Sequence, residues 1–288
     1  MTKIKSYSRA MAVQLASLLR GSGIALPERL FRHLHFIGPF NTHIPDIGTV
    51  RLMSWGNVVE NEIYWRGWNG HEPLSMNMWV KLARRGGDIL DIGANTGVFA
   101  FIAKAVSPSS RVYAFEPVER IADLADKNRE ISGLDVQVIR CAVSDERGKL
   151  PIYDPGGFNA YSASLQADFL EGRKDCYDVD VTSIDDFSQT HGLSPRLIKI
   201  DVEGAEGLAI CGAKQVLRSQ DCAIICEWLG TGSTHKEAIQ LLLELGYRAV
   251  TLDGLKPVDL WKPRLHDKNE RNLLIAKAET LKALCADL

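Results

Sequence analysis

From Trp79 onward, short apolar runs alternate with amphipathic segments along the chain. The apolar runs are typical of buried strands and predict strands at 88–92, 111–116, 136–140, 197–201, 222–227, 247–252 and 272–276. The segments between them predict helices at 97–106, 118–132, 205–218 and 234–245. Strands and helices that alternate with short loops form a parallel sheet covered on both faces. We therefore expect an α/β, doubly wound, Rossmann-like fold.

Two regions depart from this alternation. Residues 1–77 are rich in aromatic residues and are interrupted by proline and glycine. We expect an N-terminal extension of helical and irregular structure there, serving as a cap or a substrate-binding segment. Residues 78–288 form the main domain, and 144–196 are interpreted as an insertion in it, with extra strands at 148–153 and 179–184. From this place the insertion could reach over a ligand crevice.

The composition narrows the class of protein. Lys and Arg total 34 against 36 Asp and Glu, a formal net charge of −2 without a basic stripe, so we expect no nucleic-acid partner. The six cysteines show neither a CxxC pair nor zinc-ligand spacing, which favours a reduced, cytoplasmic setting. The pattern of residues 1–30 predicts an amphipathic helix that covers part of the core or contacts a partner. Contact with a membrane surface is the alternative. The oligomeric state stays open.

The first predicted strand leads into a glycine-bearing turn, Asp91-Ile-Gly-Ala-Asn-Thr-Gly97. Glycine lets the backbone turn sharply and approach a ligand closely. The acid two residues before Gly93 suits a cationic ligand better than a diphosphate, because a carboxylate repels phosphate. S-adenosylmethionine (SAM) is such a ligand, with an ammonium, a sulfonium and no phosphate. The alternative for Asp91 is a helix cap or a turn residue.

A second acid, Glu116, ends the next predicted strand, 25 residues after Asp91. A carboxylate there can accept hydrogen bonds from both ribose hydroxyls of an adenosine. Proteins that bind NAD share this feature, so an NAD-dependent oxidoreductase stays an alternative. The chain lacks the G-x-G-x-x-G turn and a Tyr-x-x-x-Lys pair, and both absences disfavour it.

Further acids follow the later strands. Asp201 ends the strand at 197–201, Glu203 and Glu206 come directly after it, and Glu227 ends the strand at 222–227. Because the carboxyl ends of parallel strands share one edge, we expect Asp201 and Glu227 at the same rim as Asp91 and Glu116. Each acid taken singly could be a solvated strand end or a helix N-terminal charge, most of all Glu206. Asp201, Glu203 and Glu227 could also hold a divalent cation, although acid clusters without metal are commoner.

Five segments in this order resemble the FkbM family of SAM-dependent methyltransferases: 91–97, 114–117, 142–145, 183–186 and 198–206. The stretch 269–277 resembles the closing strand of that family, so the resemblance covers roughly 79–277. It implies a sheet of about seven strands with the last one antiparallel. Members mostly methylate hydroxyl groups, often on sugars or polyketide-type natural products. The acceptor is therefore expected to be a small molecule or a glycan.

The resemblance also implies roles for single residues. The methionine part of SAM would be surrounded by Asp91, Gly93, Ala94, Asn95 and Gly97. Glu116 would hold the ribose, Pro117 and Ala142 would flank the adenine, and Asp201 would lie near the methionine end and the transferred methyl group.

Methylation of an alcohol is helped by a general base, because a neutral hydroxyl is a poor nucleophile. We expect the base to be Glu203, Glu227 or His235, and His235 is expected in a loop after the fifth strand. Asp201 is a further candidate for a catalytic role. Glu72, before the helix that precedes the first strand, could close over the cofactor, or it could be a helix-start acid. N-methylation and a non-catalytic scaffold of the same fold stay alternatives to O-methylation.

Overall fold

The computed structural model describes residues 13–18, 20, 27, 31, 33–156, 163–165, 175–229, 232–262 and 271–286. The chain divides into two compact units, Met1–Pro73 and Leu74–Leu288. Within the described residues, no helix is both long enough and apolar enough to cross a membrane.

The first unit contains a β-hairpin that the sequence did not predict. Strands β1 (Ile37–Ile44) and β2 (Gly48–Trp55) pair antiparallel, and α3 (Val58–Arg66) and η1 (Gly67–Asn69) follow them. Every second residue near the end of each strand is buried, but the buried positions include Thr42 and Ser54. These inward polar residues interrupt the apolar alternation that marks a strand. The expectation of only helical and irregular structure was wrong for this segment.

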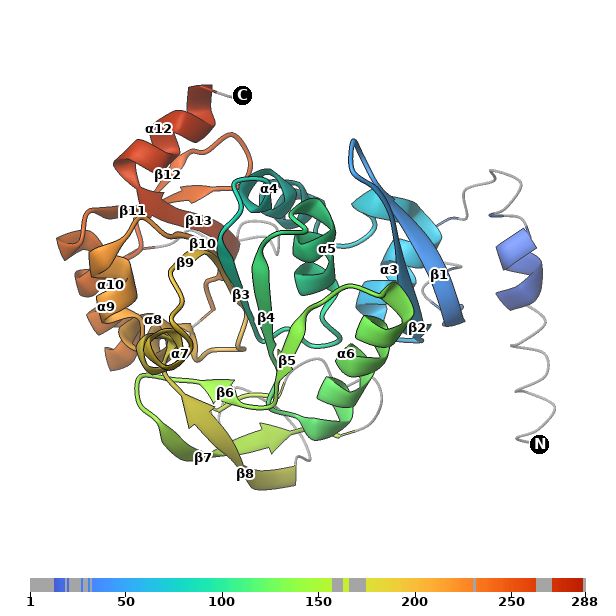
Figure 1. The fold of residues 1–288 in the computed structure, drawn as a ribbon, viewed down its shortest axis with the longest axis horizontal. Helices are drawn as coiled ribbons and strands as arrows, with labels where there is room; N and C mark the ends of the chain where they lie inside the picture. The colour runs from blue at the N-terminus through green and yellow to red at the C-terminus, as the bar shows by residue number, and fades with distance from the viewer. Residues whose placement is uncertain are drawn as a thin grey trace. The chain divides into compact units, whose positions relative to one another are not determined.

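The second unit is built on one large sheet (Figure 1). Its described strands are ordered β12-β11-β13-β10-β9-β3-β4-β5. The bounds are β3 (Asp88–Ile92), β4 (Arg111–Phe115), β5 (Gln137–Ile139), β9 (Pro195–Ile200), β10 (Ala223–Glu227), β11 (Tyr247–Thr251), β12 (Pro257–Val258) and β13 (Asn272–Lys277). Strands β5, β4, β3, β9 and β10 pair parallel, whereas β13 pairs antiparallel with β10 and β11.

This sheet confirms the doubly wound α/β fold and the antiparallel final strand. The seven predicted strands correspond to β3, β4, β5, β9, β10, β11 and β13. The two-residue strand β12 adds an edge that was too short to predict. The order of the parallel strands reverses between β3 and β9, and open α/β sheets bind ligands beyond the carboxyl ends at such a point.

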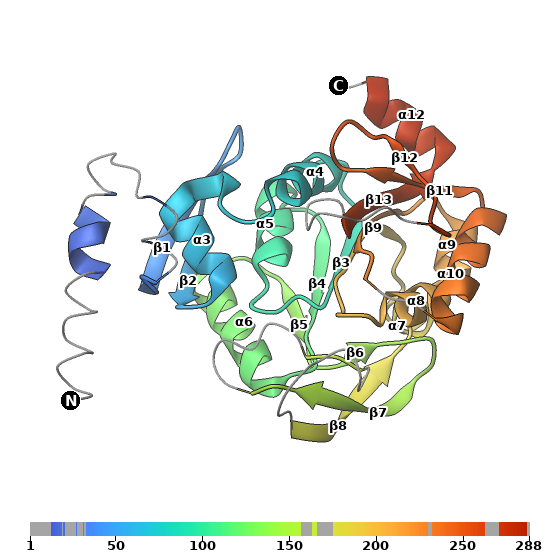
Figure 2. The same ribbon diagram turned by 180° about the vertical axis from the view of Figure 1, so that it is seen from behind.

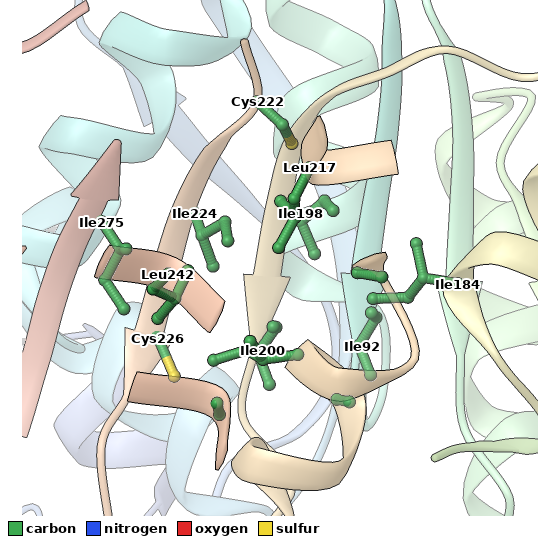
Figure 3. Close-up of a cluster of buried hydrophobic side chains, with 14 of the residues drawn as sticks. Ile92, Ile184, Ile198, Ile200, Leu217, Cys222, Ile224, Cys226, Leu242 and Ile275 are labelled. Atoms are coloured by element: carbon green, nitrogen blue, oxygen red, sulfur yellow. The ribbon is translucent and has the colours of Figure 1, made fainter. Parts of the chain in front are cut away.

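Helices cover both faces of the large sheet (Figures 1 and 2). One face carries α5 (Val98–Val106) and α6 (Glu119–Ser132), and the other carries α8 (Glu206–Cys211), α9 (Lys214–Ser219) and α10 (Ser233–Glu244). Other helices are α4 (Pro73–Ala83), α7 (Ile184–His191) and α12 (Ala278–Ala286). Figure 3 shows the core between the sheet and the second group, where side chains such as Ile198, Ile200 and Ile224 meet Leu217 and Leu242.

The single helix predicted at 205–218 is instead two short helices, α8 and α9. Asp185 of α7, which is distant in the sequence, binds both the end of α8 and the start of α9. Its N–H donates to the carbonyl of Gly212 (2.8 Å), and its carboxylate accepts the N–H groups of Gln215 and Val216 (2.8 and 2.9 Å). A carboxylate on these first-turn amides acts as a cap, so a residue remote in sequence determines the break.

Two strands of the insertion, together with β6 just before it, form a small three-stranded sheet. Strand β8 (Asp175–Thr182) pairs parallel with β6 (Ala142–Val143) and antiparallel with β7 (Gly148–Asp154). Both extra strands exist, but the strand predicted at 179–184 begins earlier and ends at Thr182. The hydroxyl of Ser183 accepts the N–H of Asp186 (3.0 Å), and this cap starts α7 at Ile184.

Candidate functional site

A cavity of about 580 Å³, including its open mouth, lies at the carboxyl edge of the large sheet. The loops after β3, β4 and β9 form its floor, and the insertion contributes to its wall. Its lining residues are Ile92, Gly93, Asn95, Phe115, Glu116, Pro117, Ile121, Cys141, Ala142, Val143, Ile152, Ala163, Leu165, Asp201, Val202 and Glu203.

The charges in this cavity all have one sign. Three acidic residues, Glu116, Asp201 and Glu203, line it, and no lysine or arginine does among the described residues. One wall is apolar and belongs to a small cluster that includes Ile121, Ala142 and Ile152. A cavity of this kind suits a ligand with positive charge and one apolar ring better than a diphosphate.

Gly93 brings the loops after β3 and β9 into contact. Its φ of 78° is in the left-handed region, and a Cβ there would overlap the carbonyl oxygen of Asp201. The N–H groups of Gly93 and Ala94 donate to the carbonyl of Phe115 (3.1 and 2.9 Å). Only glycine fits this position, because both the backbone angle and the close approach exclude a side chain.

Asp91, Ala94 and Gly97 support this loop without lining the cavity. Asp91 is 1% exposed, and its Oδ2 accepts the N–H of Ala100 in the first turn of α5 (3.0 Å). Gly97 precedes that helix with a φ of 83°. The structure thus places Asp91 at a helix start, the alternative that the sequence left open.

Glu116 is the buried acid of the cavity. Its two oxygens accept the N–H groups of Asn95 (3.0 Å) and Val118 (2.9 Å). Burial, which disfavours the charged form, outweighs these hydrogen bonds and raises the pKa of Glu116 to about 7. Pro117 and Ala142 line the same cavity.

Asp201 has a partner that sequence reasoning missed. Lys199 Nζ lies 2.6 Å from Asp201 Oδ2, and the lysine side chain is only 4% exposed. The same ammonium lies 4.5 Å from the centre of the Phe99 ring. A lysine inside an apolar strand, two residues before an acid, is the available signal, since residues i and i+2 share a face of a strand.

Glu203 lies in a tight turn after Asp201. Its φ is 50° and that of Gly204 is 98°, and the Glu203 carbonyl accepts the hydroxyl of Ser164 from the insertion (2.7 Å). The N–H of Gly204 donates to Glu206 (2.8 Å). Glu206 was expected most readily as a solvated acid, but it is fully buried.

The other candidate bases, Glu227 and His235, do not line the cavity. His235 lies in α10, not in a loop as expected, is 3% exposed, and its Nε2 lies 3.2 Å from Glu206 Oε2. Glu227 ends β10, one strand beyond the cavity, opposite Asn272. Glu72 belongs to the first unit, where its carboxylate lies 3.6 Å from His71 Nε2. Among the described residues, no group of three or more His, Cys, Asp or Glu is spaced to hold a metal ion.

Comparison with known proteins shows the family of this chain. The family described as the methyltransferase FkbM domain matches residues 91–249, more than half of the chain. The chain belongs to the FkbM methyltransferase family. This confirms the resemblance and the methyltransferase class, and it decides against the NAD-dependent oxidoreductase.

Individual relatives are distant. The chain is 24% identical over 194 residues to the 31-O-demethyl-FK506 methyltransferase FkbM of Streptomyces tacrolimicus, which covers 58% of this chain and 75% of that protein. It is 29% identical over 143 residues to the 2-O-methyltransferase NoeI of Sinorhizobium fredii, and this match covers 45% of this chain and 58% of that protein. A solved structure of methyltransferase FkbM from Methylobacillus flagellatus is 17% identical with a TM-score of 0.40, and the match covers 66% of this chain and 43% of that one.

Proposed function

We propose that this FkbM methyltransferase uses SAM to methylate a hydroxyl group on a small-molecule natural product or on a sugar of a glycan. One observation carries the choice of donor: the cavity has three acids and, among the described residues, no lysine or arginine. SAM carries a sulfonium and an ammonium, so such a cavity attracts it. The two relatives above, named as O-methyltransferases, support oxygen as the acceptor atom.

The lining residues fit the parts of SAM. The Glu116 carboxylate, held by two backbone amides, would accept the ribose hydroxyls. Ile121, Ala142 and Ile152 give an apolar wall on which an adenine would lie. Asp201, whose carboxylate is paired with Lys199, would face the charged methionine end.

When bound, SAM supplies an electrophilic methyl group on a good leaving group. The protein must hold the acceptor hydroxyl in line with that group and remove its proton. Glu203 is the proposed base, because it lines the cavity whereas Glu227 and His235 do not. Asp201 is less suited to the role, because Lys199 already stabilises its charge. The proposed partner is a hydroxylated small molecule or glycan, and not a nucleic acid.

Isothermal titration with SAM, S-adenosylhomocysteine and NAD tests the donor. We expect micromolar binding of the first two and none of NAD. Glu116→Ala should weaken both by at least about tenfold, the effect of losing a charge-assisted pair of hydrogen bonds. Tighter binding of NAD than of SAM would contradict the proposal.

A screen of sugars and hydroxylated natural products, with release of S-adenosylhomocysteine as the readout, tests the acceptor. Glu203→Gln should keep SAM affinity and lower kcat by about 100-fold or more, the usual contribution of a general base. An acceptor that is methylated on nitrogen would establish the N-methyltransferase alternative. A scaffold would bind no SAM.

A further inference from the structure

The turn that carries Glu203 has an unfavourable backbone. Residues Glu203 and Gly204 have φ values of 50° and 98° in succession. Left-handed angles are disfavoured for residues with a Cβ, and Glu203 has one. Such angles persist at functional sites only where the surroundings hold them. The turn therefore requires restraints from outside itself.

The first restraint comes from the buried acid Glu206. Its Oε1 accepts the N–H of Gly204 at 2.8 Å, and its side chain is 0% exposed. This bond spans the turn from the first residue of α8 back to Gly204. A fully buried carboxylate is costly unless hydrogen-bond donors surround it. Neighbouring groups must therefore fix the orientation of the Glu206 carboxylate.

His235 determines that orientation. Its Nε2 lies 3.2 Å from Glu206 Oε2, while its Nδ1 is buried and has no hydrogen-bond partner among the described residues. Trp228 packs edge-on against this ring at 5.3 Å. A Cβ on Gly207 would lie 2.9 Å from the backbone nitrogen of His235, so α8 and α10 pack closely there.

The second restraint comes from the insertion. The Ser164 hydroxyl donates to the Glu203 carbonyl at 2.7 Å. Ser164 is 1% exposed and is fixed by two backbone hydrogen bonds with Tyr153 of β7 (2.9 and 3.1 Å). Its neighbours Ala163 and Leu165 line the cavity. One segment of the insertion therefore lines the cavity and also contacts the Glu203 backbone.

We propose that Glu206, His235 and Ser164 are positioning residues that clamp the Glu203–Gly204 turn from two sides and so aim the Glu203 carboxylate into the cavity. Glu206 and His235 act on the Gly204 N–H, and Ser164 acts on the Glu203 carbonyl. None of the three lines the cavity itself. The catalytic meaning of this clamp rests on Glu203 being the base proposed above, whereas the clamp itself does not.

Amide hydrogen exchange of the full chain, followed by mass spectrometry, tests the clamp without an acceptor. Glu206→Gln and Ser164→Ala should speed exchange in the 201–206 peptide by at least about tenfold, with SAM affinity kept within about threefold. Ser164→Thr keeps the hydroxyl and should restore slow exchange. Unchanged exchange at the turn, or a rise that is equal across the chain, would overturn the clamp.

Tyr247→Phe is the matched control. Tyr247 is also fully buried, and its hydroxyl reaches the carbonyls of Leu217 and Gln220 (both 3.3 Å) at the opposite edge of the sheet. This variant should lower Tm and leave exchange at 201–206 unchanged. If Glu206→Gln fails to fold, Ser164→Ala carries the test, because it removes a single oxygen atom.

A double-mutant cycle then separates the two proposals. Glu206→Gln should lower kcat by about 100-fold through misplacement of the base, and should add nothing in a Glu203→Gln background. Additive losses would overturn the positioning role. If Glu203→Gln leaves methyl transfer intact while the exchange result holds, the assignment of the base fails and the clamp stands.

Discussion

The loops after β4 and β9 both bring an acid to the same cavity, but they hold it by different means. After β4, Glu116 is fixed by two local backbone amides, those of Asn95 and Val118. After β9, Asp201 depends on Lys199, and Glu203 depends on contacts from α8, α10 and the insertion. The Glu116 carboxylate is thus held by backbone donors, whereas Asp201 and Glu203 also depend on side chains from elsewhere in the chain.

This difference matches the parts of SAM that the two loops would hold. Every SAM-dependent reaction presents the same ribose, so a rigid backbone cradle suits Glu116. The methyl group must meet an acceptor that varies between enzymes, so a turn held by replaceable side chains can be adjusted. The comparison predicts that changes after β9 alter catalysis, while changes after β4 alter cofactor binding and its pH dependence.

The largest effect is expected at Gly93 in the loop after β3, which donates to the Phe115 carbonyl at the end of β4 and packs against the Asp201 carbonyl after β9. Gly93→Ala should lower the free energy of unfolding by more than about 3 kcal/mol and abolish SAM binding, because the new Cβ overlaps the Asp201 carbonyl. Urea denaturation and titration measure the two. Gly133→Ala is the control: its φ is 68° with nothing within 4 Å of a Cβ, so only about 1 kcal/mol of left-handed strain should appear. Equal losses would mean that the contact between the loops does not matter.

The ion pair of the β9 loop comes next. Lys199→Met should lower the free energy of unfolding by about 1–3 kcal/mol, because it removes the ammonium paired with the Asp201 carboxylate while it keeps packing on Phe99. The partial exposure of Asp201 limits the loss. Lys149→Met removes an exposed pair of similar length with Asp180 and should cause no measurable change. A silent Lys199→Met would show that the pair does not hold the loop.

Sequence reasoning found the large sheet because its strands are buried on both faces. Residues 223–226 and 273–276, for example, are continuous apolar runs next to charged or polar residues. The same logic located Glu116, Asp201 and Glu203, since residues at the carboxyl ends of parallel strands meet at one edge. It also pointed to Glu227, which lies one strand too far from the reversal of strand order.

What sequence reasoning missed depends on partners that are distant along the chain. Glu206 is buried only because α10 brings His235 against it, 29 residues away. The helix break at Gly212 requires Asp185, and the hairpin buries Thr42 and Ser54. Local periodicity contains none of these contacts, because each is made only when the tertiary structure forms.

The raised pKa of Glu116 predicts a pH dependence of SAM affinity and of stability that originates in the loop after β4. Ribose hydroxyls bind the ionised form, so SAM affinity should rise by up to about tenfold between pH 6 and 8, around the pKa of about 7, with release of a proton. Without ligand, the folded state holds this proton more tightly than the unfolded chain, whose glutamate pKa is about 4.5. Its contribution to the free energy of unfolding therefore falls as pH rises from 4.5 to 7.

Titration in buffers of different ionisation enthalpy measures the proton release, and urea denaturation at several pH values measures the stability. Glu116→Gln should remove both pH dependences. It should also make the protein relatively more stable than the wild type at pH 8. A pH profile that persists in Glu116→Gln would assign the titration to another group.

The smallest effect is expected at Asn95, and it tests whether the β4 side relies on backbone alone. Asn95 has a φ of 53° and reaches Glu116 through its N–H, not its side chain. Asn95→Gly keeps that N–H and relieves the left-handed strain, although its side chain no longer accepts the Thr96 N–H. Stability should change by less than about 0.5 kcal/mol, and SAM affinity by less than about threefold. Asn95→Ala keeps the same N–H but adds about 1 kcal/mol of strain. A large loss of affinity in Asn95→Gly would mean that the side chain also binds the ligand, and the two loops would then differ less than their hydrogen bonds indicate.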